Sequence, residues 1–337
     1  MAGCSSEDTL DGALDRSKEL IQFGIGSVQN TDTRGETVLE IPTSGNNQFR
    51  VYVFEAPALG NNLGNSSVAS QKYSGVNSYI TITNTTGGLS YSNYYWPAAK
   101  NNRLKFSAYY PPTHSSLSSV TQSEISGDPY LKMTYYAADN PIDHTDLLYA
   151  SSADLYHIPT VALDFKHALT KLSFYAQVAP GGTMEADVII QSIKISGVSK
   201  RGDLYIRGTN DIMWDISPYT KTPYMFSTGN GLTGEVLPLR ENVGNRDEYV
   251  SAFTEASGDL MVVPQSLDEM MMEVVIEVHK IDGNVDIEKN YFIPAEDYPW
   301  APGTHIRYWM TVARDVILTS ADIQRWEEGS GKVINLY

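Results

Sequence analysis

The stretch "MMMEVVIEVHKIDGNVDIEKNYFIP", residues 270–294, holds two runs in which apolar and polar side chains alternate. A period of two is typical of strands that bury one face. The two runs are separated by Asp282, Gly283 and Asn284, residue types that favour the tight turn of a β-hairpin. This stretch therefore predicts two antiparallel strands joined by a hairpin turn.

Runs of the same kind recur along the whole chain. They extend over residues 18–28, 47–56, 103–111, 186–198, 202–207 and 305–318. In the second run the alternation places Phe49, Val51 and Val53 on one face. "DLLYASSADL", residues 146–155, is the best helix candidate, but no amphipathic segment carries capping signals at both ends. Many short strands without alternating helices predict an all-β fold of sandwiches or barrels.

The composition limits the partners that the chain can bind. Its 337 residues include 24 basic and 40 acidic side chains, which gives a net charge of −16. Such a surface is repelled by nucleic-acid phosphates and by anionic lipids, so neither is an expected partner. The sequence contains no apolar run of about 18 residues, the length that a membrane-spanning helix needs.

Motifs of catalysis and metal binding are not found in the sequence. The six histidines lack the spacing of a helical metal site, and no second cysteine supports a zinc cluster. A hydrolase elbow of the form G-x-S-x-G is absent. The sequence therefore predicts no enzyme, no cofactor and no metal site. The tripeptide Arg-Gly-Asp at 201–203 is interpreted as a turn between two strands.

The chain has a single cysteine, Cys4, within "AGCSSED", residues 2–8. This stretch resembles the end of a bacterial lipobox, in which a signal peptidase cuts before a cysteine that then carries lipid. Glu7 and Asp8 resemble the surface-export signals of Bacteroidetes lipoproteins. Several acyl chains on one residue give stable membrane anchoring. The resemblance implies lipid on Cys4 and a place at the outer membrane or cell surface; the alternative is an incidental free thiol.

Four further stretches, in this order, resemble the signatures of the Bacteroidetes fimbrillin-like family. They are "YYWPAAKNNRLKFSAYYP" (94–111), "DFKHALTKLSFYAQV" (164–178), "LMVVPQSL" (260–267) and "YPWAPGTHIRYWMTV" (298–312). The resemblance implies two tandem transthyretin-like β-sandwich domains. We expect a lipoprotein tether over 1–19, an N-terminal domain over 20–160 and a C-terminal domain over 161–337, with a possible donor-strand tail. A break in the strand pattern around 140–160 indicates the same boundary.

The resemblance also implies a route of processing. Stalk subunits of the family are trimmed at a basic residue by an arginine-specific protease. Arg34 lies in the polar loop "QNTDTRGET", where a protease has access, and it is the expected cleavage site. Lys18 and Arg16 are alternatives. A stalk or tip subunit would be trimmed and would lose the lipid on Cys4, whereas an anchor would keep it.

Trimming in this family removes the first strand, and a strand from a neighbouring subunit fills the vacated groove. In this chain the displaced strand would carry Ile21, Phe23 and Ile25. Main-chain hydrogen bonds and side-chain pockets make such strand addition tight. The candidate donor residues in the C-terminal region are Val316, Leu318 and Trp326. A C-terminal strand that belongs to its own domain's sheet is an equal alternative.

Two functions remain in competition. The first is a structural or adhesive subunit of a surface fimbria, whose partners are other copies, other fimbrial subunits or a surface ligand of a host or bacterium. The second is a surface glycan- or ligand-binding lipoprotein that stays monomeric. In the second, Tyr91, Tyr94, Tyr95 and Trp96 would form an aromatic platform for sugars. The other interpretation of these aromatics is packing at a core and a sheet edge.

Overall fold

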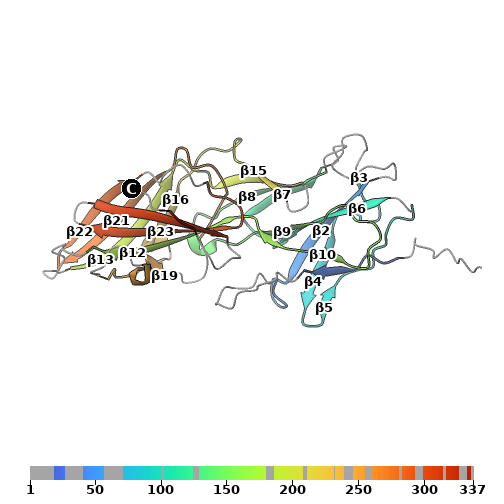
Figure 1. The fold of residues 1–337 in the computed structure, drawn as a ribbon, viewed down its shortest axis with the longest axis horizontal. Coiled ribbons are helices and arrows are strands. Elements are labelled where there is room, and N and C mark those ends of the chain that lie inside the picture. Colours follow the sequence, from blue (N-terminus) through green and yellow to red (C-terminus); the bar gives the residue numbers. More distant parts are fainter. Residues whose placement is uncertain are drawn as a thin grey trace, which may run out of the picture.

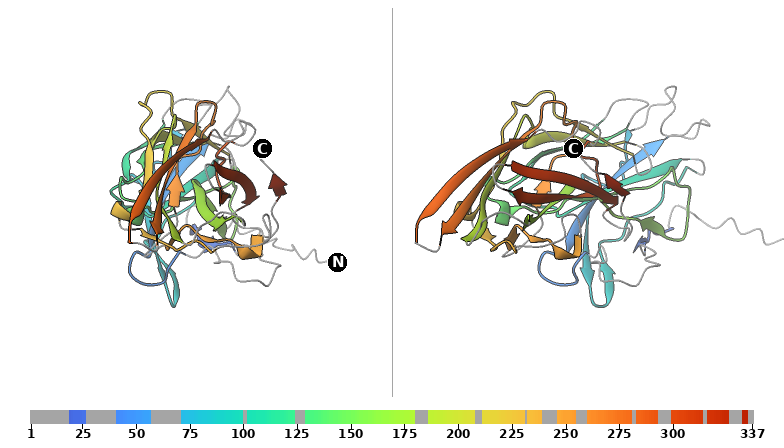
Figure 2. Two further views of the ribbon diagram at one scale, coloured as in Figure 1. Left: turned by 90° about the vertical axis from the view of Figure 1, so that its left-hand side faces the viewer. Right: turned by 60° about the vertical axis from the view of Figure 1, so that its left-hand side comes forward.

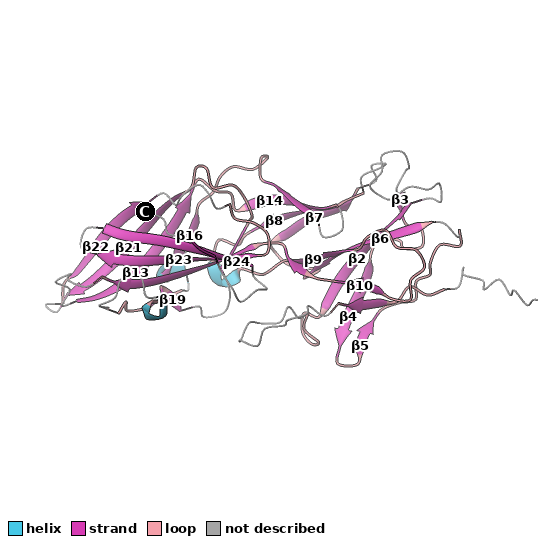
Figure 3. Ribbon diagram, viewed as in Figure 1, coloured by secondary structure: helices cyan, strands magenta, loops and turns pink. Residues whose placement is uncertain are grey.

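The computed structural model confirms an all-β fold with several sheets (Figure 3). It describes residues 19–26, 41–56, 71–99, 102–123, 129–179, 186–207, 211–230, 232–238, 246–254, 260–280, 283–292, 299–313, 316–325 and 332–334. Short 3₁₀ turns in these ranges are η2 (Pro141–Asp143), η3 (Thr228–Asn230) and η4 (Arg246–Glu248). Within the same ranges, no helix has the length and apolar character needed to cross a bilayer.

A seven-stranded sheet forms one end of the elongated molecule (Figure 1). Its order is β11-β9-β6-β2-β4-β5, and β3 pairs with the far end of β2. The strands are β2 (Gln48–Ala56), β3 (Gln71–Lys72), β4 (Ile80–Thr85), β5 (Gly88–Ser90), β6 (Arg103–Tyr110), β9 (Leu148–Ser151) and β11 (Lys166–His167). Beside it, β1 (Phe23–Ile25) pairs in parallel with β10 (Val161–Leu163).

Strand β2 is buried on both faces. The predicted face of Phe49, Val51 and Val53 packs into one hydrophobic cluster, which also contains β1 and β10 side chains. Tyr52 and Phe54 point to the other face and enter a second, larger cluster. The alternation of β2 therefore supplies two cores at once, and the seven-stranded sheet becomes a middle layer.

A four-stranded sheet connects the two ends of the molecule. Its order is β15-β14-β8-β7, with β7 (Leu117–Gln122), β8 (Leu131–Tyr136), β14 (Arg201–Ile206) and β15 (Ile212–Asp215). Two of these strands precede residue 160 and two follow it, and β8 and β14 are hydrogen-bonded neighbours. The larger cluster likewise joins side chains from both halves. The division into two domains near residue 160 stays a prediction.

The other end of the molecule is built from two sheets that lie as separate layers (Figure 2). One has the order β18-β12-β23-β24-β25, with β20 also on β12; the other has the order β16-β13-β21-β22. A short pair, β17 and β19, lies outside these two sheets. Phe174 and Phe226 meet across the layers, with ring centroids 5.4 Å apart.

The strands of this end have the following bounds. They are β12 (Thr170–Val178), β13 (Ala186–Ser196), β16 (Tyr224–Ser227), β17 (Thr233–Gly234), β18 (Val250–Ser251), β19 (Phe253–Thr254), β20 (Leu260–Val262), β21 (Met271–Lys280), β22 (Val285–Phe292), β23 (Thr304–Ala313), β24 (Val316–Arg325) and β25 (Lys332–Ile334). The predicted hairpin is confirmed, because β21 and β22 pair antiparallel and Gly283 has a φ of 83° in the turn between them.

The predicted helix at 146–155 is wrong, because this stretch contains strand β9. Leu148 and Ala150 enter the smaller cluster, while Leu147 and Tyr149 enter the larger one. A strand that is buried on both faces has a continuous apolar run. Periodicity alone cannot distinguish such a run from a buried helix.

The Arg-Gly-Asp tripeptide forms the beginning of strand β14, so its interpretation as a turn is also wrong. Asp203 is 4% exposed. Its carboxylate accepts hydrogen bonds from Thr134 and Tyr219, each at 2.6 Å, and pairs with Lys132 at 2.8 Å. Burial acts to raise the pKa of Asp203, but these three donors outweigh it and hold the pKa below its ordinary value. Asp203 is thus a buried structural acid.

His144 is buried between residues that precede and residues that follow residue 160 in the chain. Its two ring nitrogens have different partners. Nδ1 accepts the Met261 N–H at 3.0 Å, so Nε2 carries the proton and donates to the Ala138 carbonyl at 3.1 Å. A second proton on Nδ1 would face an N–H group. Burial, with a smaller contribution from the positive charge of Lys200, lowers the pKa of His144 to about 4.

We predict that the folded protein loses stability as the pH falls from about 6.5 to about 4. In this window His144 is protonated in the unfolded chain and stays neutral in the folded protein. The free energy of unfolding therefore declines as the pH falls, by on the order of 3 kcal/mol for this residue. Denaturant unfolding at several pH values measures it. His144→Gln should reduce the dependence without removing it, because burial also lowers the pKa of His305, to about 3. Equal slopes for the wild type and His144→Gln would contradict the prediction.

Candidate functional site

The predicted first strand lies in residues 19–26, called the N-terminal segment below. Its first residues lie antiparallel to residues 94–96, which precede β6 in the chain. The Ile21 N–H donates to the Tyr94 carbonyl at 2.8 Å, and the Trp96 N–H donates to the Glu19 carbonyl at 3.0 Å. The first half of the segment is therefore held by an isolated antiparallel bridge, in which Leu20 lies opposite Tyr95.

The second half of the segment turns to a different partner. In β1, Phe23 lies opposite Val161 of β10 in a parallel register. The Val161 N–H donates to the Gln22 carbonyl at 2.7 Å, and the Gly26 N–H donates to the Leu163 carbonyl at 3.2 Å. The segment thus connects residues 94–96 with residues 161–163. All of these backbone hydrogen bonds are made by the eight residues 19–26.

The apolar side chains of the segment point inward as the alternation predicts. Ile21 is 1% exposed and Phe23 is 7% exposed, and Ile25 is partly buried against the same cluster. The Phe23 ring meets Phe106 and Tyr91 edge to face, at centroid distances of 5.6 and 5.2 Å. The Tyr91 hydroxyl also accepts the Phe23 N–H at 2.9 Å. Phe23 is the central anchor of the segment.

A buried histidine holds the beginning of the segment. The Nδ1 atom of His157 lies 3.0 Å from a Glu19 carboxylate oxygen, and the histidine side chain is 2% exposed. Its ring stacks on Trp96 at a centroid distance of 5.3 Å. Its φ of 38° is a left-handed conformation that few residues other than glycine adopt. Sequence reasoning missed this contact, because nothing in the pattern around residue 157 links it to residue 19.

The aromatic cluster at 91–96 belongs to the surface that receives the segment. Trp96 is buried, Tyr91 and Tyr94 are partly buried, and of the four aromatics Tyr95 alone is exposed, at 44%. The Tyr95 carbonyl accepts a bond from the Tyr73 hydroxyl at 2.6 Å. These residues pack at a core and an edge, as the second interpretation of them predicts, and they do not form an exposed platform for sugars.

Three predicted site residues, Cys4, Arg34 and Trp326, lie outside the residues that the structure describes. Lipid attachment at the first and cleavage at the second therefore stay predictions. In the described ranges, no group of three or more His, Cys, Asp or Glu is arranged to hold a metal ion.

The candidate donor residues of β24 are paired within this chain. Val316 lies opposite Ala313 of β23, and Leu318 lies opposite Thr311. On its other side β24 pairs with β25. In this isolated chain β24 belongs to its own sheet, so donation by residues 316 and 318 stays a prediction.

The chain matches the model of the fimbrillin-like family over residues 33–326. In structure it resembles a fimbrial protein from Bacteroides vulgatus, with a TM-score of 0.61 and 17% identity over 91% of this chain and 99% of that chain. It also resembles a candidate cell adhesion protein from Bacteroides uniformis, with a TM-score of 0.50 and 14% identity over 92% of this chain and 99% of that chain. No curated protein matches it.

These likenesses give the chain the fold of a Bacteroides fimbrial protein. The family model extends over most of its length, and the chain belongs to the fimbrillin-like family. Membership supports a role as a fimbrial or adhesive subunit.

We predict that Phe23→Ala lowers the free energy of unfolding of the N-terminal end by about 3 kcal/mol, because it empties a closely packed aromatic site. Denaturant unfolding, followed by tryptophan fluorescence, measures the change. Gln22→Ala is the matched control, since Gln22 is the exposed neighbour on the same segment, and it should change the value by less than about 0.5 kcal/mol. Equal effects of the two substitutions would contradict an anchoring role for Phe23.

Proposed function

We propose that this chain is a non-enzymatic subunit of a cell-surface fimbria, exported as a lipoprotein through Cys4 and assembled by strand exchange after cleavage at Arg34. Cleavage there would release residues 1–34, which include the whole N-terminal segment. A strand from a neighbouring subunit would then take its place. Family membership supports the coarser part of this proposal.

The observation that carries the proposal is how the N-terminal segment is held. Ile21 and Phe23 fill apolar sites among Trp96, Phe106 and Val161, yet the backbone of the segment pairs over only three residues of β1 and a few neighbours. Loss of the segment would uncover this apolar surface and unpaired backbone groups of β10. An exposed edge of this kind is a template for another strand.

We predict that brief treatment of the lipid-free protein with an arginine-specific protease produces a ladder of multimers. Strand exchange resists SDS because each donor makes a full set of main-chain hydrogen bonds in a buried groove. The products are separated in SDS without boiling, and mass spectrometry reads the new N-terminus. The ladder should begin with cleavage between Arg34 and Gly35, and Arg34→Gln should abolish both events.

A truncated variant distinguishes trimming from exchange. Deletion of residues 326–337 removes Trp326 and β25 but keeps β24 in its sheet. This variant should be trimmed normally. It should form no ladder when the donor lies in residues 326–337, whereas a ladder would assign donation to β24, which carries Val316 and Leu318. Resistance of the full chain at Arg34 would contradict the trimming step. Trimming of the full chain without any ladder would contradict self-assembly and leave a subunit that depends on another kind of partner.

A further inference from the structure

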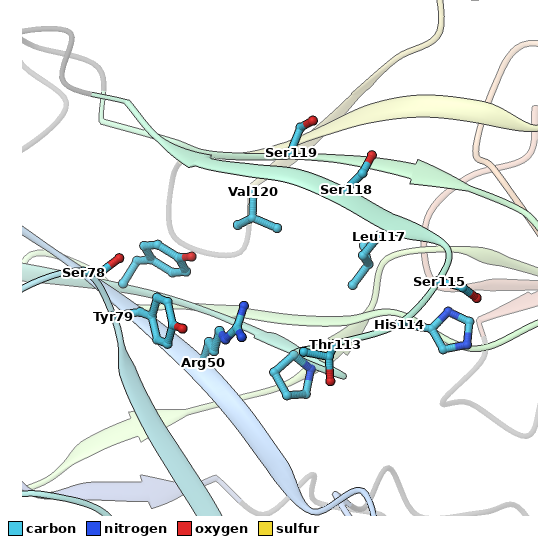
Figure 4. Close-up of a pocket in the computed structure, with 12 residues that line it drawn as sticks. Arg50, Ser78, Tyr79, Thr113, His114, Ser115, Leu117, Ser118, Ser119 and Val120 are labelled. Atoms are coloured by element: carbon cyan, nitrogen blue, oxygen red, sulfur yellow. The ribbon is translucent and has the colours of Figure 1, made fainter.

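A cavity of about 700 Å³ lies on the opposite side of β2 from the N-terminal segment, between β2 and the edge strand β7 (Figure 4). Its size falls within the roughly 300–1,000 Å³ that is typical of small-molecule sites. Arg50 and Tyr79 lie on the lower side of the cavity, and Leu117 and Val120 project toward them from β7 (Figure 4). The cavity thus has an aromatic and cationic floor and an aliphatic roof.

The guanidinium of Arg50 is held in a fixed orientation. Its Nη1 atom donates to the Tyr109 hydroxyl at 3.2 Å, and its Cζ atom lies 4.3 Å from the centroid of the Tyr79 ring. The Tyr109 bond uses one of the five N–H donors of the guanidinium. A planar, preorganised fork of this kind is suited to a carboxylate, which it binds through two parallel hydrogen bonds.

Among the described residues that line the cavity, Arg50 is the one that carries a charge. His114, at one end, accepts the Ser116 N–H on Nδ1 at 3.1 Å and contacts Thr145 through Nε2 at 2.8 Å. Burial lowers the pKa of His114, so it is neutral at pH 7. None of the described lining residues is acidic, although the whole chain has a net charge of −16.

The roof exists because β7 carries a bulge. In a regular strand, Leu117 and Val120 would point to opposite faces, because they are three residues apart. The register with β8 shifts between Ser118 and Thr121, and Ser119 has a φ of 53°. The bulge turns both apolar side chains into the cavity, while Ser118 and Ser119 point away (Figure 4). Bulges of this kind often lie beside functional sites, where they redirect side chains.

We propose that this cavity binds a carboxylated sugar residue, such as a uronic acid at the end of a glycan. The carboxylate would pair with Arg50, and one C–H face of the ring would pack against the exposed part of Tyr79, beside the guanidinium that lies over the same aromatic ring. The roof would cover the opposite face of the ring. Hydroxyl side chains lie along the rim to meet the sugar hydroxyls; they are Ser78, Thr113 and Ser115. This site is independent of cleavage and strand exchange.

The test compares two ligands that differ in one group. Methyl β-glucuronide carries a carboxylate where methyl β-glucoside carries a hydroxymethyl group. Binding of each to the full, untrimmed chain is measured by calorimetric or NMR titration at pH 7 and physiological salt. The glucuronide should bind, the glucoside should bind at least about tenfold more weakly, and acetate should also bind more weakly, because it lacks the ring.

Variants locate the site. Arg50→Met should weaken glucuronide binding by about tenfold to a hundredfold, since it removes a charge-assisted pair. Arg246→Met is the matched control, because Arg246 also stacks on an aromatic ring, Trp309, at 5.2 Å, and it does not line this cavity. Val120→Glu should weaken binding through repulsion while Arg50 stays in place. Circular dichroism and melting temperatures verify that each variant is folded.

Three results would overturn the proposal. The first is no binding of the glucuronide up to its solubility limit. The second is a glucoside that binds as tightly as the glucuronide, which would exclude a role of the carboxylate, or acetate that binds as tightly, which would exclude a role of the ring. The third is unchanged glucuronide binding by folded Arg50→Met and Val120→Glu variants, which would place the ligand elsewhere on the chain.

Discussion

The structure depends on one constraint, the burial of both faces of β2. Phe49, Val51 and Val53 fill the smaller core, and Tyr52 and Phe54 fill the larger one. Because a strand alternates its side chains strictly, a shift of one residue would exchange the two sets and disrupt both cores. The central sheet is therefore fixed in register, and the layers on either side of it are positioned by the same nine residues.

Both candidate sites follow from this arrangement. On one face of β2, the smaller core continues into the N-terminal segment, which completes it with Ile21 and Phe23. On the other face, Arg50 lies in the same alternating row as Tyr52, at the end of β2 where the larger core gives way to the cavity under β7. A rigid middle layer would let the proposed strand exchange and the proposed ligand binding take place while the sheet stays in place, since stability is distributed unevenly over a fold.

The lengths of two strand pairings bear on the proposed strand exchange. Strand β1 pairs with β10 over three residues, whereas β23 and β24 pair over ten. Much of what holds the N-terminal segment is the burial of Ile21 and Phe23, supported by a few backbone bonds and the contact between Glu19 and His157. Apolar burial is not directional, so in the proposed exchange a different strand with similar side chains would fill the same sites.

The sequence by itself determined the all-β class, the hairpin at 270–294, the inward face of Phe49, Val51 and Val53, and the alternation of the first strand, because each is written in local periodicity and turn chemistry. It misjudged residues 146–155 and the Arg-Gly-Asp tripeptide, because burial on both faces and a buried acid depend on neighbours distant in sequence. Only the tertiary structure decided that β1 pairs with β10, that His157 meets Glu19, and that a bulge in β7 covers Arg50. Those contacts join segments tens of residues apart, and no local pattern encodes which segments will meet.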